Sequence, residues 1–334
     1  MKLPPPRGPV SAALTAALQA APHDLPAGLA DGFGDGDPIT DEDLQLTLFV
    51  CYELHYRGFD GVDDGWEWQP SLLGLRAAAE QRFESALRRL VEPLPETAPA
   101  DVPRALAGLV AADDGPSLAG YLQRRATREQ FCEFVMHRSV YHLKEADPHT
   151  WAIPRLGGRA KAALIEIQID EYGGGQLDAM HAELFRTTMS CLHLDTTYGG
   201  YLPQVPAVTL ATSNLISLFG LHRRLRGALL GHLAAFEMTS SLPNRRYGNG
   251  LRRLGGSPVA TRFYDEHVEA DAVHEQIAAH DMCGSFAAAE PENASEVLFG
   301  AACGLAVDRL FATHLLNRWE AGEGSLREPT LQAA

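Results

Sequence analysis

Three ionisable side chains share one helix face in the segment FYDEHVEADAVHEQ, where His267, Asp271 and His274 lie at positions i, i+4 and i+7. At about 100° per residue, these positions fall within roughly 60° of arc over about two helical turns. Two imidazoles and a carboxylate in one stripe can bind one metal ion or contribute to a pair of ions. The alternative is a polar helix face with two solvated histidines, and this segment alone favours neither.

A second segment, KAALIEIQIDEYGGGQLDAMHAELF, places Glu171 and His181 ten residues apart. In an unbroken helix this spacing corresponds to a rise of about 15 Å, too long for both side chains to bind one ion. Three glycines at positions 173–175 lie between them, and glycine readily leaves helical geometry. We therefore predict a break that returns His181 to the side of Glu171. A flexible turn without further meaning is the alternative.

Glu237 is a carboxylate within the apolar segment GHLAAFEMTSS. A buried carboxylate requires a cation or a hydrogen-bond partner. A metal ion would meet that requirement, whereas an amphipathic helix would expose Glu237 to water. Both interpretations stay open for Glu237 taken by itself.

The order of these residues resembles the haem-oxygenase-like diiron oxidases and oxygenases, often called iron-containing redox enzymes. Members of that family carry a Glu, then a Glu and a His in one region, a further Glu, and finally a His-x-x-x-Asp-x-x-His helix. The resemblance covers roughly residues 120–285. It implies seven residues that are both metal ligands and catalytic residues: Glu145 (in HLKEADPHTW), Glu171, His181, Glu237, His267, Asp271 and His274.

The resemblance further implies two iron ions that cycle between Fe²⁺ and Fe³⁺, with dioxygen as co-substrate. A mixture of imidazole and carboxylate suits non-haem iron or manganese better than structural zinc. Four carboxylates would balance the charge of two ferrous ions, so the loaded site could be buried. Glu171 or Glu237 is the expected bridge between the ions.

The expected activity is that of a non-haem diiron oxidoreductase acting through a peroxo-diferric intermediate. Its substrate would be a small carboxylate-bearing molecule, such as an amino-acid derivative or a fatty acid. Two alternatives stay open. One is a metal-free member of the same superfold that acts as a hydrolase or binds a ligand, and the other is an iron-storing protein without turnover.

Helices must position these ligands, because the sequence shows few strand signals and no internal repeat. We therefore predict an all-α fold, and the resemblance makes it a haem-oxygenase-like helical bundle. The helix-length segments from residue 117 onward are punctuated by Pro and Gly and lie at about 127–145, 158–171, 176–193, 206–239, 259–281 and 292–320.

Three regions are expected along the chain. Residues 1–38 are rich in Pro, Gly, Ala and Asp and are predicted to form a loose arm. Residues 39–115 form an N-terminal helical extension, with a helix capped at Thr40. Residues 116–325 form the diiron domain. Within the extension, Glu53 and His55 are two positions apart on a helix and point to different sides, so we interpret them as structural.

Composition limits the partners. A net charge of −15 and a pI near 5.3 argue against nucleic acid or an anionic membrane, since both require a broad basic face. Five cysteines without a CxxC pair, and prolines at the start of the chain, favour a cytoplasmic protein with reduced thiols. We expect a small-molecule substrate, an electron donor and a homodimer.

Several other residues are given no metal role at this point. The arginines between residues 222 and 262 are interpreted chiefly as ion pairs or an interface, with substrate binding as the alternative. Four histidines lack any partner at a useful spacing and are interpreted as surface or core residues: His142, His149, His193 and His232.

Overall fold

The computed structural model describes residues 1–94 and 96–328, with the backbone alone for residues 270–273. Within these ranges the chain forms helices and short turns and no strand, which confirms the predicted all-α fold. The α-helices are α1 (Pro9–Ala17), α2 (Glu42–Glu53), α3 (Pro70–Val91), α4 (Val102–Ala112), α5 (Leu118–Arg124), α6 (Arg128–His142), α7 (Asp147–Thr150), α8 (Gly158–Glu171), α9 (His181–Cys191), α10 (Ala207–Leu221), α11 (Arg226–Arg253), α12 (Pro258–Gln276), α13 (Ser285–Ala289) and α14 (Ala294–Glu320).

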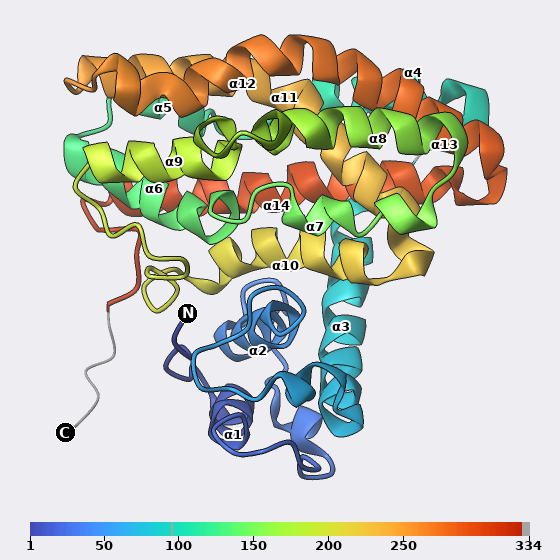
Figure 1. The fold of residues 1–334 in the computed structure, drawn as a ribbon, viewed down its shortest axis with the longest axis vertical. Helices are drawn as coiled ribbons and strands as arrows, with labels where there is room; N and C mark the ends of the chain where they lie inside the picture. The colour runs from blue at the N-terminus through green and yellow to red at the C-terminus, as the bar shows by residue number, and fades with distance from the viewer. Residues whose placement is uncertain (95, 329–334) are drawn as a thin grey trace.

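Helix α11 is the central element of the main bundle and packs along both α12 and α14 (Figure 1). Small residues allow the close crossing of α11 and α14. A Cβ on Gly231 would lie 1.8 Å from the carbonyl oxygen of Val297, and one on Gly300 would lie 1.9 Å from that of Ala228. Only glycine permits the two backbones to approach so closely at these positions.

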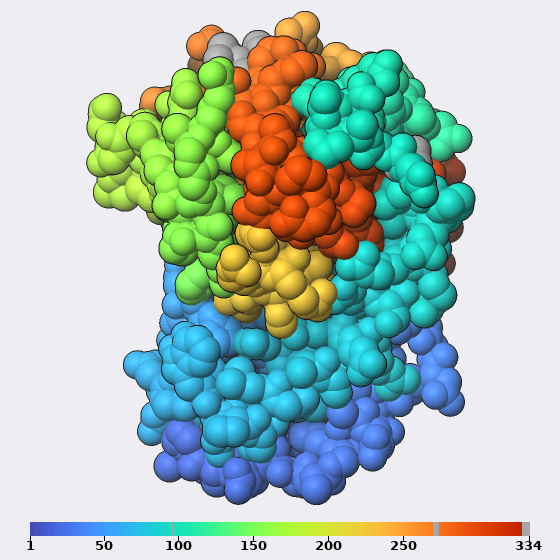
Figure 2. Space-filling view, turned by 90° about the vertical axis from the view of Figure 1, so that its right-hand side faces the viewer, coloured from blue at the N-terminus to red at the C-terminus, as the bar shows by residue number. Residues whose placement is uncertain are grey.

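The N-terminal region lies against one side of this bundle, where α2 packs on α10 (Figure 1). The buried Asn214 side chain donates to the backbone oxygen of Gln45 at 2.8 Å across this contact. Figure 2 shows the N-terminal residues at one end of the molecule and the α3–α4 segment along its side. Apolar contacts run continuously from Val10 to Trp319, so both parts share one core. The predicted division at residues 38 and 115 stays a prediction.

The prediction of a loose arm over residues 1–38 is wrong for α1. Asp43 accepts hydrogen bonds from the backbone N–H groups of Val10 and Ser11, at 2.9 and 2.7 Å, and so caps the first turn of α1. Val10 and Leu14 are fully buried. The Pro- and Gly-rich composition concealed a short amphipathic helix whose cap is supplied by α2.

Several predicted helix boundaries also differ. The segment expected at 206–239 is two helices, because the chain turns at Arg223–Leu225 between α10 and α11. Helix α11 then continues through Pro243 to Arg253. Helix α6 ends at His142 and not at residue 145, so Glu145 lies in the turn that follows it. Helix α9 begins at His181 and not at residue 176. Helix α2 is capped by the Asp41 side chain instead of Thr40.

The stretch Pro291–Glu320, which contains α14, is long and apolar enough to cross a membrane by length and composition. Of its most apolar window, 61% is buried against other helices, as expected for the core helix of a bundle. All five cysteines are free thiols.

Candidate metal centre

Glu145 lies in the turn that follows α6. The next residue, Ala146, has a left-handed backbone with φ of 71°, a conformation that costs a non-glycine residue about 1–3 kcal/mol. The side chain of Gln168 from α8 donates to the Ala146 carbonyl oxygen at 3.1 Å. This bond helps to hold the turn that directs the Glu145 carboxylate inward.

Glu171 is the last residue of α8, and His181 is the first residue of α9. The predicted break at the glycines is confirmed, since residues 173–175 all have positive φ. A Cβ on Gly173 would lie 2.4 Å from the backbone carbon of Ala179, so the chain can fold back only without one. As a result, His181 Nδ1 lies 2.9 Å from Glu171 Oε2.

The remaining described candidates come from α11 and α12. His267 Nε2 lies 3.7 Å from Glu145 Oε1, and His274 Nδ1 lies 3.4 Å from Glu237 Oε2. Both histidines are almost completely buried, as is Glu237. Asp271, between them on α12, has its side chain outside the described part of the structure.

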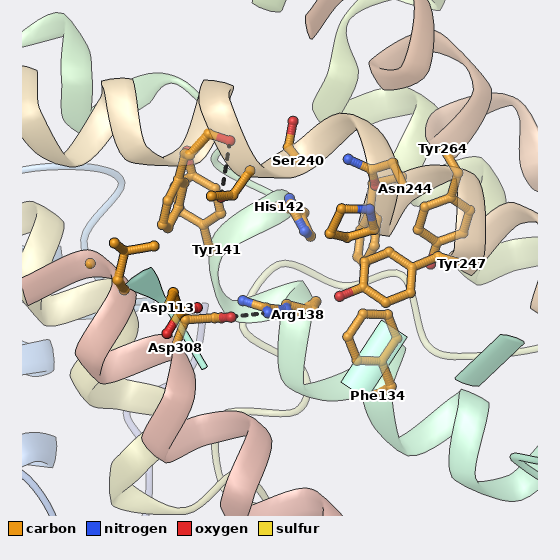
Figure 3. A pocket seen from close by; sticks show the side chains of 16 residues that line it. Asp113, Phe134, Arg138, Tyr141, His142, Ser240, Asn244, Tyr247, Tyr264 and Asp308 are labelled. Carbon is orange, nitrogen blue, oxygen red and sulfur yellow. Dashed lines mark hydrogen bonds and ion pairs between the residues drawn. The ribbon is translucent and has the colours of Figure 1, made fainter. Parts of the chain in front are cut away.

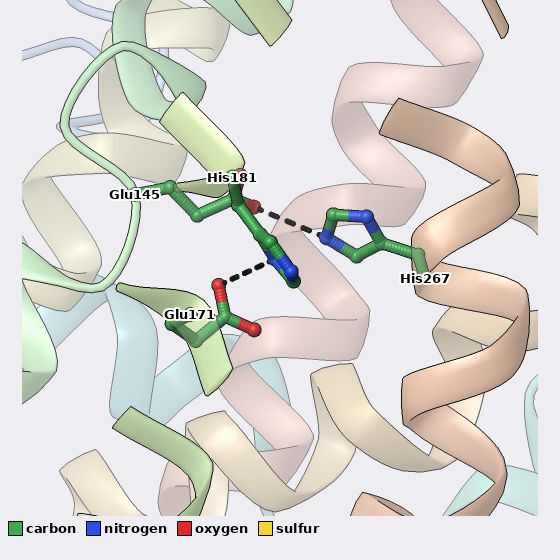
Figure 4. Close-up of side chains that lie close together, drawn as sticks. All are labelled: Glu145, Glu171, His181 and His267. Atoms are coloured by element: carbon green, nitrogen blue, oxygen red, sulfur yellow. Dashed lines mark ion pairs between the residues drawn. The ribbon is translucent and has the colours of Figure 1, made fainter. Parts of the chain in front are cut away.

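Six of the seven candidates converge in two groups that share one residue. Glu145, Glu171, His181 and His267 each offer a ligand atom within 4.8 Å of the others (Figure 4). Glu171, Glu237 and His274 form a second such group by the same measure. Because Glu171 belongs to both, its carboxylate lies where the two groups meet.

The donor atoms in these groups fit iron. Within these two groups, four buried atoms make no hydrogen bond: Glu145 Oε2, Glu171 Oε2, His181 Nδ1 and His274 Nδ1. Unsatisfied buried polar atoms are costly, and carboxylate oxygens together with imidazole nitrogens are ligands of non-haem iron. A metal ion in each group would satisfy atoms that the protein leaves without a hydrogen-bond partner.

Hydrogen bonds on the far side of two rings fix their orientation. His267 Nδ1 donates to the backbone oxygen of Phe263 at 2.8 Å, which turns Nε2 toward Glu145. His274 Nε2 lies 2.9 Å from Asp170 Oδ2, which leaves Nδ1 facing Glu237. Metal-binding histidines usually donate their second N–H to a carbonyl or a carboxylate in this way. Sequence reasoning missed Asp170, whose partner lies 104 residues away.

Charges within the groups shift the pKa values of their members. Burial alone would raise the pKa of Glu171, but His181 outweighs burial and lowers it. Burial would lower the pKa of His274, but the neighbouring carboxylates of Glu237 and Asp170 raise it to about 9. Without metal, therefore, protonated histidines hold the carboxylates together. A metal cation would replace these protons.

His142 was interpreted as a residue without a metal role, yet its Nδ1 lies 2.7 Å from Glu145 Oε1. The i, i+3 spacing of the two residues could have suggested this contact. A cavity of about 80 Å³ adjoins the groups, and Glu171, Glu237 and His267 line it. That volume would hold two or three waters at about 30 Å³ each.

A larger pocket of about 240 Å³ lies next to this cavity (Figure 3). The two spaces share five lining residues: Tyr141, His142, Phe236, Ser240 and Asn244. Six of the residues that line the larger pocket are Phe or Tyr, and Arg138 pairs there with Asp308 at 2.7 Å. Three of the arginines singled out in the sequence form ion pairs elsewhere: Arg224, Arg226 and Arg252. Sequence spacing gave no signal for Arg138.

Comparison with known proteins agrees with this arrangement. A stretch of 138 residues is 29% identical to a nitrosourea synthase from Streptomyces achromogenes subsp. streptozoticus, covering 41% of this chain. The match covers 29% of that protein's length, so the chain corresponds to less than a third of it. The profile of the iron-containing redox enzymes matches residues 132–309, more than half of the chain, and includes all seven candidate ligands. The chain therefore belongs to the family of iron-containing redox enzymes, and its all-α, haem-oxygenase-like fold is confirmed.

Proposed function

We propose that this protein is a non-haem diiron oxidase or oxygenase that oxidises a small carboxylate-bearing substrate, such as an amino-acid derivative or a fatty acid. The observation that carries the proposal is the pair of ligand groups that share Glu171. Glu145, His181 and His267 would complete the first ion site with Glu171, while Glu237 and His274 would complete the second. Asp271 is proposed as a further ligand from its place on α12.

Two bound ferrous ions would supply the electrons that activate dioxygen, with manganese as the alternative metal. The chain's own residues orient and protect this centre. The Phe263 carbonyl and Asp170 fix the rings of His267 and His274, so that each presents one nitrogen to the centre. Phe236 and Leu233 line the cavity beside the carboxylates and limit the access of water.

The larger pocket is the proposed substrate site. Its apolar walls would bury the body of the substrate next to the centre, because the two spaces share lining residues. Arg138 is held by Asp308 and by the Tyr247 hydroxyl, and it stacks on Phe311 at 4.5 Å. A guanidinium fixed in this way can bind a substrate carboxylate through its remaining N–H groups.

The nitrosourea synthase supports an oxidative reaction of this type, although the match covers only part of that protein. A cytoplasmic location, a homodimer and an external electron donor stay predictions.

Metal analysis tests the proposal. Protein loaded anaerobically with ferrous iron and then desalted should retain close to two ions per chain. Well under one ion would favour a metal-free member of the superfold. Rapid mixing of loaded protein with oxygen should show oxidation that responds to the correct amino-acid derivative or fatty acid. Oxidation indifferent to every candidate would favour iron storage.

Substitution of the shared residue sharpens the test. Glu171→Ala should lose both ions, because Glu171 belongs to both groups, whereas His274→Ala should lose one. Glu183→Gln is the matched control, since Glu183 lies two residues after His181 but pairs with Arg186 at 3.1 Å. It should keep both ions. Equal losses in all three variants would indicate general instability and contradict the assignment.

A further inference from the structure

A buried ion pair joins the N-terminal region to the turn that carries Glu145. Lys144 Nζ lies 3.1 Å from Glu53 Oε2, and their side chains are 2% and 0% exposed. The Tyr198 hydroxyl lies 2.8 and 2.9 Å from the two oxygens of Glu53. Two charges without water must stay together, because separating them leaves an uncompensated buried charge. The pair therefore fixes Lys144 relative to α2.

Aromatic rings from the same region surround the Lys144 ammonium group. It lies 5.1 Å from the ring centroid of Phe49 and 4.3 Å from that of Tyr56. An ammonium group over a ring face is attracted by the negative charge of that face, and desolvation strengthens the attraction. Phe49 lies in α2, and Tyr56 lies three residues after the end of that helix. The segment 49–56 therefore surrounds the ammonium group on several sides.

Arg57 adds contacts on either side of Lys144. Its guanidinium donates to the backbone oxygen of Leu143 at 3.3 Å and lies 3.6 Å from Asp147 Oδ2. It also lies over the ring of Tyr198, at 4.4 Å. The segment 53–57 thus contacts Lys144, immediately before Glu145, and Asp147, two residues after it.

We propose that Glu53 and Lys144 are positioning residues through which the N-terminal region holds Glu145 in the metal centre. Lys144 precedes Glu145 directly, and Ala146 follows it in a left-handed conformation that needs support from its surroundings. Gln168 supports the turn from the side of α8, and Glu53 supports it from α2. The family profile begins at residue 132, so Glu53 lies outside the part of the chain that the family shares.

This inference rests on the proposed two-metal function, and it predicts that the two ion sites respond differently. Glu145 belongs to only one ligand group, whereas Glu237 and His274 belong to the other. Loss of the Glu53–Lys144 pair should therefore weaken one site, while the second site keeps its affinity. Loss of a group that orients a ligand typically lowers metal affinity on the order of 10–100-fold.

Anaerobic titration of the full-length protein with ferrous iron, read out as the number and affinity of bound ions, tests the inference. Glu53→Gln and Lys144→Met each break the pair. The double variant Glu53→Gln/Lys144→Met carries no buried charge at this position, so it should fold even where a single variant does not. Each folded variant should bind one ion with nearly wild-type affinity and the other about 10–100-fold more weakly.

Glu80→Gln is the matched control. Glu80 is a buried carboxylate in α3 that pairs with Arg76 at 3.3 Å and His222 at 2.9 Å, away from the Glu145 turn. Its loss should lower stability and leave both ions in place. Two ions at unchanged affinity in the Glu53 and Lys144 variants, or an equal loss in Glu80→Gln, would overturn the positioning role alone. Fewer than one ion on the wild-type protein would overturn the two-metal function and the inference together.

Discussion

Replacement of Asp170 by alanine is expected to weaken the second ion site without removing any ligand. Asp170 Oδ2 lies 2.9 Å from His274 Nε2 and fixes the ring so that Nδ1 faces Glu237. Groups in this position usually change metal affinity by about 10–100-fold. The Asp170 side chain is 57% exposed, so water screens its charge and only the orienting hydrogen bond acts at full strength. We therefore expect a loss of about tenfold, equivalent to about 1.4 kcal/mol.

Anaerobic titration with ferrous iron at pH 7 measures this loss directly. The weakened ion should be the one that His274 binds, while the affinity of the Glu145 group stays the same. Alanine cannot stabilise a positive charge on His274 as a carboxylate does, so the pKa of this ring should fall in the metal-free protein. Fewer protons should then be released when the metal binds.

Glu166→Gln is the control for charge alone. Glu166 is an exposed acid one turn before Asp170 on α8, and its replacement removes the same charge without touching His274. Its metal affinity should equal that of the wild-type protein. Wild-type affinity in Asp170→Ala, or an equal loss in Glu166→Gln, would refute the argument that a hydrogen bond to His274 organises the site.

Three further predictions concern the backbone, the protons and the buried histidines. Gly173→Ala should lose bound iron, because the added Cβ would lie 2.4 Å from the backbone carbon of Ala179. Gly174→Ala should keep its iron, because nothing lies within 4 Å of a Cβ added there. Equal iron content in the two variants would contradict this prediction. Metal affinity should rise with pH and level off above about pH 9, because the pKa of His274 is raised to about 9 and its proton must leave as metal binds. A metal affinity that is constant from pH 6.5 to 9 would contradict this prediction. Burial lowers the pKa of three histidines, His137, His149 and His232, and lowers that of His149 to about 4. Below about pH 6.5, the unfolded chain therefore binds more protons than the folded protein does. The free energy of unfolding should accordingly fall by about 1.4 kcal/mol per pH unit for each histidine as the pH drops from 6.5 toward 4, and denaturation curves that coincide at pH 6.5 and 5 would exclude this.

The parts of the centre that the sequence predicted correctly are local in the chain. The placement of His267 and His274 on one side of α12 follows from helix periodicity, and the return of His181 to Glu171 follows from the intervening glycines. Glu145 and Glu237 came from the family resemblance, and both lie with the other candidates. The roles of all seven candidates as metal ligands stay predictions.

Residues that act across long sequence separations could not be predicted in this way. Asp170 and His274 are 104 residues apart, and Lys144 and Glu53 are 91 apart. Neither pair has a spacing that a helix or a turn would favour, because packing of whole helices brings the partners together. Glu53 was interpreted as structural, and nothing in its spacing to His55 indicated the contact with Lys144.

The two ligand groups differ in their surroundings, and this difference suggests that they have different roles. Glu145 directly follows the buried Lys144 in the sequence, and Lys144 contacts Glu53. The Glu145 side chain contacts His142, which lines the proposed substrate pocket. A substrate that presses on His142 would therefore act on the Glu145 carboxylate. His274 instead contacts Asp170, which is 57% exposed. If the two groups bind ions as proposed, substrate binding would change the geometry of the Glu145 group. Asp170, which is exposed, would give the proton that leaves His274 a path to water.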